Sequence, residues 1–330
     1  MKTVLAQIKL KTADFKFNAE NIINNAAKCD CDLIIFPQSD IEDLGGKDLV
    51  LDETCRKRQY EFYQEIADRN FKQNILIGDI LIRNGEIEVS HNGFFDVNGK
   101  KVFVSDTYLE DVECDLYVLA KNRYFAKNTY MDFVDSIQSD CNLIYVNAIG
   151  IADENIFAGG SFAKNANNEL VLQMPVCKED IETVDFSRVI EFFDEAEEAQ
   201  ILDVVTFALK EYCENTGFKK VVLGLSGGID SALTAAIAVK ALGADSVTGI
   251  MMPSMYSSEG SVTDSIKLAE NLGIKTITEP ITPLFNAFMQ GRESLHDLAE
   301  ENLQARLRGL ILMFYSNREN MLLLSTGNKS

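Results

Sequence analysis

Residues 221–243, VVLGLSGGIDSALTAAIAVKALG, constrain the fold of this chain more than any other stretch. An apolar, partly β-branched run leads into two glycines, and an alanine-rich segment follows. This order predicts a buried strand, a tight turn and a helix. Gly227 and Gly228 allow positive φ and a close backbone approach, so successive N–H groups can surround an anion. The stretch therefore predicts a phosphate-binding loop at the start of a helix.

The polar side chains of this stretch fit the same interpretation. Ser226 and Ser231 can add hydroxyl donors, and Asp230 can cap the helix or hold a Mg²⁺ ion that bridges phosphates. A Walker A loop would require a lysine after the second glycine, and a Rossmann fingerprint would require G-x-G-x-x-G. Neither pattern is present in the stretch.

The second part of the chain repeats a strand–helix order around this loop. Mostly apolar strands covered by helices on both faces are typical of a parallel sheet. Two further helices and the strand MLLLS complete the pattern. The expected elements before them are helices at 201–215, 230–242 and 259–272 and strands at 219–225, 246–252 and 274–279.

The first 185 residues alternate short apolar strands with amphipathic helices, which predicts a layered α/β domain. The turn-rich segments DVNGKK and KNANNEL predict hairpins within it. An acidic, helix-forming stretch near residue 190 marks a change of pattern and a domain boundary.

Composition narrows the possible functions. The chain has 330 residues, enough for two domains, and a formal net charge of −20, which argues against a nucleic-acid partner. No apolar run is long enough for a membrane span. Seven scattered cysteines and an opening without a signal-peptide pattern indicate reduced thiols and a cytoplasmic location.

The spacing S-G-G-x-D-S resembles the phosphate loop of the N-type ATP pyrophosphatases, which grips the pyrophosphate released when ATP transfers its AMP. Together with LAEENLQARLRGLILMFYSNRENMLLLSTGNKS, the region resembles the synthetase domain of glutamine-dependent NAD synthetases. The resemblance implies that the carboxylate of deamido-NAD attacks the α-phosphorus of ATP, and that ammonia then displaces AMP to give NAD. Adenylation turns a poor acylating agent into a reactive one, so the protein mainly positions groups and neutralises charge.

The resemblance also implies site residues. Asp230 is the expected Mg²⁺ ligand, and Asn302 and Arg306 are expected to contact deamido-NAD. The loop MMPSMYSSEGS should face the adenine, although Ser257 or Ser258 could simply cap a helix. A stripe of Leu303, Leu307, Leu310 and Phe314 predicts core or a dimer interface. The expected ATP-binding residues are Gly224, Leu225, Ser226, Gly227, Gly228, Ile229, Asp230, Ser231 and Thr326.

Two N-terminal segments resemble nitrilase-superfamily glutaminase domains: one ends in DLIIFPQSDIEDLGG, and the other begins with CNLIYVNAIG. Their chemistry uses a glutamate base, a lysine and a cysteine nucleophile. Gln38 occupies the position of the base, and an amide cannot accept the thiol proton. The expected lysine position reads SDTYLED, Lys100 and Lys101 are assigned to a turn, and the segment that should carry the nucleophile is missing. Cys114 is the nearest cysteine, and a packed, inert thiol is its default interpretation.

The resemblance implies an α/β fold with a nitrilase-like α-β-β-α sandwich followed by a Rossmann-like parallel-sheet ATP pyrophosphatase domain. We expect the inactive glutaminase-type domain at 1–187, a linker at 188–199 and a synthetase domain at 200–330 that lacks its C-terminal part.

The expected function is ATP-dependent amidation of deamido-NAD, with ammonia or glutamine as the nitrogen source and a separate protein as one source of ammonia. A homo-oligomer, a dimer or larger, is implied. Two alternatives stay open: a phosphate-loop amidotransferase acting on another acceptor, and a noncatalytic nucleotide-binding or assembly subunit.

Overall fold

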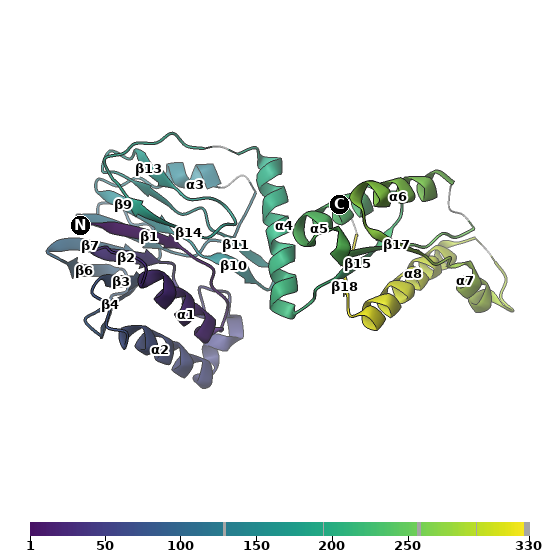
Figure 1. Cartoon of the computed structure of the whole chain (residues 1–330), viewed down its shortest axis with the longest axis horizontal. Helices are drawn as coiled ribbons and strands as arrows, with labels where there is room; N and C mark the ends of the chain where they lie inside the picture. Colours follow the sequence, from purple (N-terminus) through teal and green to yellow (C-terminus); the bar gives the residue numbers. More distant parts are fainter. Residues whose placement is uncertain (128–129, 194, 256–258, 295, 327–330) are drawn as a thin grey trace. The chain divides into compact units, whose positions relative to one another are not determined.

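The chain folds into two compact units, Met1–Val204 and Val205–Ser330 (Figure 1). The two units are described separately below. The computed structural model describes residues 1–127, 130–193, 195–255, 259–294 and 296–326.

Two six-stranded sheets form the centre of the first unit. In spatial order, the first sheet contains β14 (Asp180–Val184), β1 (Thr3–Gln7), β2 (Leu33–Phe36), β3 (Asn74–Ile77), β4 (Ile80–Arg83) and β5 (Glu86–Val89). The second contains β13 (Leu170–Gln173), β12 (Phe162–Lys164), β9 (Asn142–Val146), β8 (Leu116–Ala120), β7 (Lys100–Ser105) and β6 (Gly93–Val97). The remaining elements are α1 (Phe15–Ala26), η1 (Lys47–Leu51), α2 (Glu53–Ala67), α3 (Tyr130–Ser136), β10 (Ile149–Ala152) and β11 (Asn155–Ala158).

The core of this unit consists of three clusters of buried side chains, one between the two sheets and one on the outer face of each sheet. Leu5 and Leu33 pack between the two sheets, whereas their neighbours Val4 and Ile34 pack against α1 and α2. On the outer face of the second sheet, Phe103 packs in a cluster that includes residues of α3. Successive residues of a strand point to opposite faces, so both faces of each sheet are buried. The result is the expected α-β-β-α sandwich.

Both hairpins expected in this unit are present. The segment DVNGKK joins β6 to β7, and KNANNEL joins β12 to β13, each as an antiparallel pair. Lys100 and Lys101 are the first two residues of β7 rather than turn residues. Their position in a strand corrects the assignment made from the sequence.

The second unit contains a four-stranded parallel sheet. Its strands are, in spatial order, β17 (Lys275–Thr278), β16 (Val247–Met251), β15 (Val221–Leu225) and β18 (Leu322–Leu323). The helices along this part of the chain are α4 (Glu197–Thr216), which begins before the unit boundary, α5 (Ile229–Leu242), η2 (Ala244–Ser246), α6 (Glu259–Leu272), α7 (Thr282–Met289) and α8 (Leu298–Glu319).

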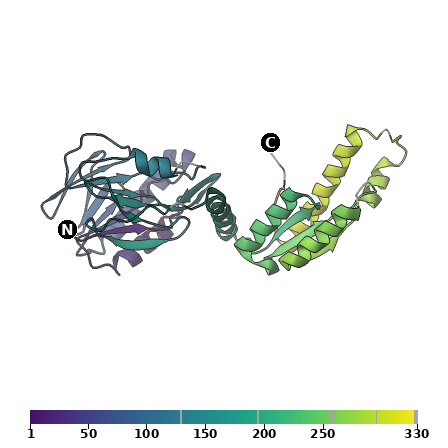
Figure 2. The same ribbon diagram turned by 90° about the horizontal axis from the view of Figure 1, so that it is seen from above.

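Helices cover both faces of this sheet. Leu223 and Leu225 pack with α5 and α6, while Val222 packs with Ile311 of α8 on the opposite face. Figure 2 shows α8, in yellow, across the sheet from the green helices. The α/β fold class expected from the sequence is therefore confirmed. Within the described residues, none of the helices combines the length and the apolar character that a membrane crossing requires.

Candidate functional site

The bend between β15 and α5 has the geometry of an anion-binding turn. Gly227 has φ +77°, and a Cβ atom there would lie 2.5 Å from the carbonyl oxygen of Ser261. Both the conformation and the close approach require glycine. Gly228, in contrast, has φ −88° and ψ 159°, so only one of the two glycines uses the positive φ that the sequence suggested.

The N-terminus of α5 supplies backbone donors beside this bend. Gly228 is the N-cap residue and provides no side-chain cap. The first amides of a helix have no intrahelical acceptor, so those of Ile229, Asp230 and Ser231 are left for another partner. Their N–H groups and the helix dipole favour a negatively charged group at this end of the helix.

Hydrogen bonds within the bend hold it in shape. The Ser231 side chain is buried, and its Oγ donates to the carbonyl of Gly228 at 2.9 Å. Ser226 Oγ lies 3.1 Å from Ser231 Oγ and accepts from the amide of Gly228 at 3.2 Å. Ser231 therefore braces the turn from inside rather than pointing a hydroxyl outward.

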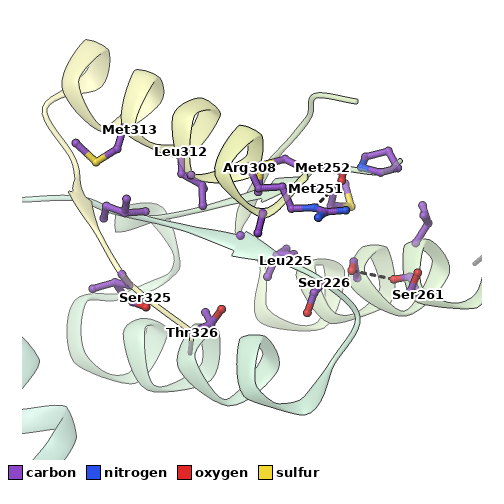
Figure 3. Close-up of a pocket in the computed structure, with 18 residues that line it drawn as sticks. Leu225, Ser226, Met251, Met252, Ser261, Arg308, Leu312, Met313, Ser325 and Thr326 are labelled. Carbon is purple, nitrogen blue, oxygen red and sulfur yellow. Dashed lines mark hydrogen bonds between the residues drawn. The ribbon is translucent and has the colours of Figure 1, made fainter. Parts of the chain in front are cut away.

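A cavity of about 880 Å³ opens at this end of the sheet (Figure 3). It lies where the chain order of the strands reverses, between β15 and β18, which is where open parallel sheets bind ligands. It is lined by Gly224, Leu225, Ser226, Met251, Met252, Pro253, Ser261, Val262, Ser265, Ala305, Arg308, Gly309, Leu312, Met313, Leu323, Leu324, Ser325 and Thr326.

The cavity brings together some of the residues expected from the sequence. Gly224, Leu225 and Ser226 at the end of β15 and Thr326 after β18 all line it. The loop after β16 also contributes, through Met252 and its neighbours, whereas Ser257 and Ser258 lie outside the described residues.

Asp230 is exposed in the first turn of α5, adjacent to the bend. Its carboxylate is the kind of hard oxygen ligand that Mg²⁺ prefers. Among the residues that the structure describes, no group of three or more His, Cys, Asp or Glu side chains could hold a metal ion. A Mg²⁺ ion at Asp230 would therefore need further oxygen ligands from phosphates or water.

Two residues expected to contact deamido-NAD lie outside the cavity lining. Asn302 and Arg306 are exposed on α8, and Arg306 Nη1 donates to the carbonyl of Asn302 at 3.1 Å. Arg308 lines the cavity instead, and its Nε lies 3.4 Å from the carbonyl oxygen of Met252. Burial lowers the pKa of the Arg308 guanidinium.

Sequence reasoning did not single out the cavity-facing stripe of α8. Ala305, Arg308, Gly309 and Leu312 follow the i, i+3, i+4, i+7 spacing of one helix face, which is the signal that could have found it. The second half of the stripe expected to be core or a dimer interface is not core within this chain, because Leu310 is 61% exposed and Phe314 is 54% exposed. The cavity-facing side of α8 instead carries alanine, arginine and glycine beside Leu312.

The first unit has a polar cluster at the corresponding end of β2. Gln38 is buried, and its Nε2 donates to Asp40 and, at 3.3 Å, to Asp79. The Gln38 Oε1 atom accepts from the amide of Asp79 at 3.2 Å. Asn122, which follows β8, donates to the Gln38 carbonyl at 2.7 Å. At the expected base position, both the Nε2 donor and the Oε1 acceptor of the Gln38 side chain therefore form hydrogen bonds.

Carboxylates close to this amide are desolvated. Burial, together with the charge of Asp79, raises the pKa of Asp40 to about 6. Tyr63 donates its hydroxyl to Asp40 at 3.0 Å. Nearby, the partly buried Asp43 forms an ion pair with Lys121, and desolvation raises the pKa of Asp43. Lys121 is a partly exposed lysine at the carboxyl end of β8 that sequence reasoning did not consider.

The candidate nucleophile Cys114 lies far from this cluster. It precedes β8, whereas Asn122, which contacts Gln38, follows the same strand. Eight residues of largely extended chain separate the two, a span of roughly 25 Å. Lys100 and Lys101 likewise lie at the amino end of β7. The structure therefore does not bring Cys114 or either of these lysines to Gln38.

The fold and the cavity define an α-β-β-α sandwich followed in the chain by a parallel-sheet domain with an open cavity at the reversal of its strand order. The family model for NAD synthase matches residues 201–330. The glutamine-dependent NAD(+) synthetase of Acinetobacter baylyi is 30% identical over 402 residues, which cover 100% of this chain and 73% of that protein. The chain belongs to the glutamine-dependent NAD(+) synthetase family, whose members are carbon–nitrogen ligases.

Other relatives agree with this assignment. The Synechocystis sp. protein of the same name is 42% identical over 201 residues, which cover 57% of this chain and only 36% of that protein. A structure of glutamine-dependent NAD+ synthetase from Acinetobacter baumannii in complex with ADP matches with a TM-score of 0.90 and 30% identity. That match covers 99% of this chain and 74% of the other.

Proposed function

We propose that this chain catalyses the ATP-dependent amidation of deamido-NAD to NAD through an adenylated carboxylate. The observation that carries the proposal is the cavity at the reversal of strand order, with the glycine bend and the uncapped N-terminus of α5 at its edge. The ADP complex of the Acinetobacter baumannii relative supports adenine-nucleotide binding in this fold.

In this proposal the backbone holds the phosphates. The N–H groups of Ile229 and Asp230 carry partial positive charge and would face the leaving pyrophosphate. Gly227, which has no side chain, lets the backbone approach the pyrophosphate closely. The internal bonds of Ser231 keep the bend from rearranging as charge moves. Thr326, which lines the cavity across from the bend, supplies a hydroxyl to the nucleotide.

We further propose Asp230 as the ligand of a Mg²⁺ ion. A carboxylate together with substrate phosphates is a common ligand set for Mg²⁺, and the exposure of Asp230 beside the bend fits it. When bound, the ion neutralises phosphate charge and makes pyrophosphate a better leaving group.

Asn302 and Arg306 remain proposed contacts of deamido-NAD on the exposed face of α8. Their side chains are accessible there, so a ligand or a second chain could reach them. Leu310 and Phe314 are also exposed on α8, at 61% and 54%, and they support the proposed homo-oligomer.

For the nitrogen source, we propose that the first unit does not hydrolyse glutamine. The amide of Gln38 has no basic atom to accept a proton, and it is fixed between Asp40 and Asp79. Cys114, the candidate nucleophile, lies at the opposite end of β8. Free ammonia, or ammonia from another protein, would then feed the synthetase reaction.

The test is ATP–pyrophosphate exchange with the full chain, measured with deamido-NAD, with other carboxylate acceptors and with none. Exchange that depends on deamido-NAD supports the proposal. Exchange with a different acceptor indicates another amidotransferase, and its absence with every acceptor indicates a noncatalytic nucleotide-binding subunit. NAD formation from ammonia but not from glutamine separates the nitrogen sources, and glutamate released from glutamine contradicts the loss of glutaminase activity.

A further inference from the structure

Two thiols of the first unit face each other across neighbouring strands. The Sγ atoms of Cys114 and Cys141 lie 3.0 Å apart. Cys114 precedes β8 and Cys141 precedes β9, and these strands pair in parallel with Leu116 opposite Asn142. The pairing of the strands therefore fixes the distance between the two sulfur atoms.

These thiols take no part in the proposed synthetase chemistry. They lie at the amino ends of β8 and β9, opposite to the strand end that carries Asn122 and Gln38. Both belong to the apolar cluster on the outer face of the second sheet. Cysteines that only pack, without reacting, are also common in such clusters. Their mutual contact and their access to a cavity distinguish them from packed, isolated thiols.

A cavity of about 640 Å³ reaches both sulfur-bearing residues. Cys114 is half-buried and Cys141 is buried, so the pair can be reached from the cavity while its inner sulfur is shielded. Ser139 Oγ lies 3.1 Å from Cys141 Sγ. Hydrogen bonds from the Cys114 thiol and from Ser139 lower the pKa of Cys141, which favours a thiolate at that position.

We propose that Cys114 and Cys141 are a redox modification site that closes to a disulfide when the chain meets hydrogen peroxide. A sulfur of the pair, as thiolate, attacks one peroxide oxygen, so that an S–O bond forms, the O–O bond breaks and hydroxide leaves to become water. The second sulfur attacks the sulfenic sulfur, the S–O bond breaks, and the departing hydroxide takes the remaining thiol proton. Overall, two thiols lose two electrons and two protons, and one peroxide becomes two waters.

The charge of the cavity selects the oxidant. Four carboxylic acids, Glu110, Asp111, Glu113 and Asp140, line it together with the two cysteines. Negative charge lowers the local concentration of anionic reagents, whereas a small neutral molecule is unaffected. Hydrogen peroxide therefore fits the site better than oxidised glutathione, which is negatively charged at neutral pH.

The disulfide would join two segments that now meet through weaker contacts. It links the loop between β7 and β8 to the turn between α3 and β9, where the Tyr108 hydroxyl already donates to the carbonyl of Gln138. Closing a loop of this size lowers the entropy of the unfolded chain, and we expect the oxidised protein to melt about 5 to 10 °C higher.

The test treats the full chain with hydrogen peroxide at neutral pH, blocks the remaining thiols and maps tryptic peptides without reduction. Trypsin separates the two cysteines, because residues 102–121 contain only Cys114 and residues 128–164 contain only Cys141. We expect these two peptides to appear linked, with a loss of two hydrogens, and to separate after dithiothreitol. At low salt, oxidised glutathione should form the link about tenfold more slowly than an equal concentration of peroxide.

Matched variants assign the link. Cys114→Ser and Cys141→Ser should each lose it and the rise in melting temperature, whereas Cys55→Ser, on α2, should retain both. Recovery of the two peptides unlinked from the wild-type chain, with either cysteine reduced or as a sulfinic or sulfonic acid, overturns the proposal. This result needs no variant, so it stands even if a serine variant fails to fold.

Discussion

The carboxyl ends of β15 and β2, two strands that pair in parallel with their neighbours on both sides, differ: one adjoins an open cavity and the other is filled by polar side chains. After β15, the glycine bend and the N-terminus of α5 adjoin a cavity of about 880 Å³ that Ser226 lines. After β2, the side chains of Gln38, Asp40 and Asp79 bond to one another. The comparison indicates that a site built from backbone donors remains available to a ligand, whereas polar side chains that bond to one another already satisfy their hydrogen-bonding capacity.

The two sites also differ in whether they favour or disfavour an added negative charge. At the end of β15, the helix N-terminus favours an added anion. At the end of β2, burial and two neighbouring carboxylates penalise negative charge, as the raised pKa of Asp40 records. The open end is therefore suited to a phosphate, and the filled end resists a further anion.

The largest expected effect is on the bend itself. Gly227→Ala should lower ATP–pyrophosphate exchange about 1,000-fold, because a Cβ 2.5 Å from the Ser261 carbonyl forces the backbone donors out of place. Gly243→Ala is the matched control, since Gly243 ends the same helix with φ +82° and a Cβ there meets nothing within 4 Å. An equal loss in both variants would show that helix strain, and not the bend, governs activity.

The second effect concerns the proposed metal ligand. Asp230→Asn should lower exchange about 100-fold at limiting Mg²⁺, because a neutral amide binds a hard divalent cation weakly. Asp245→Asn, an exposed change in η2 beyond the other end of α5, should leave the Mg²⁺ dependence unaltered. Magnesium titrations of both variants measure this, and identical curves would remove Asp230 from the metal site.

The filled site gives a pH-dependent effect on stability. Since the pKa of Asp40 is raised to about 6 in the folded chain, folding favours its protonated form, and that stabilisation is lost as pH rises through 6. Between pH 4 and pH 7, Asp40→Asn should gain about 2 kcal/mol relative to the wild type.

Urea unfolding followed by tyrosine fluorescence can measure this gain, because seven of the ten tyrosines lie in the first unit. Asp185→Asn is the control with the opposite sign. Hydrogen bonds from Ser187 lower the pKa of Asp185, so its contribution to stability is lost as pH falls. A constant difference between the wild type and Asp40→Asn would contradict the assigned pKa.

The smallest expected effect is a change in KM, which differs between substitutions of the two α8 arginines, Arg308 and Arg306. Arg308→Lys should raise the KM for ATP about tenfold with little change in kcat, because lysine cannot reproduce the planar guanidinium beside the Met252 carbonyl. Arg306→Lys should leave the KM for ATP unchanged and raise that for deamido-NAD. The reverse pattern would place the nucleotide on the exposed face of the helix.

The local pattern of the sequence predicted the fold class, the strand–bend–helix at 221–243 and the parallel sheet around it. These features depend on residues close in sequence, such as the apolar run of β15 and the glycines that follow it. Gln38, at the position where the resemblance implies a glutamate base, could also be recognised from the sequence, because its side chain lacks a basic atom.

Only the tertiary structure decided which side chains meet. The face of α8 that carries Arg308 lines the cavity, and Ser231 braces the bend from within, because packing against β15 fixes the rotation of each helix. Residues 27 positions apart in the chain, Cys114 and Cys141, come into contact only because β8 and β9 are neighbours in the sheet. Local patterns determine strands, helices and turns, whereas the pairing of strands and the rotation of helices depend on contacts between residues distant in sequence.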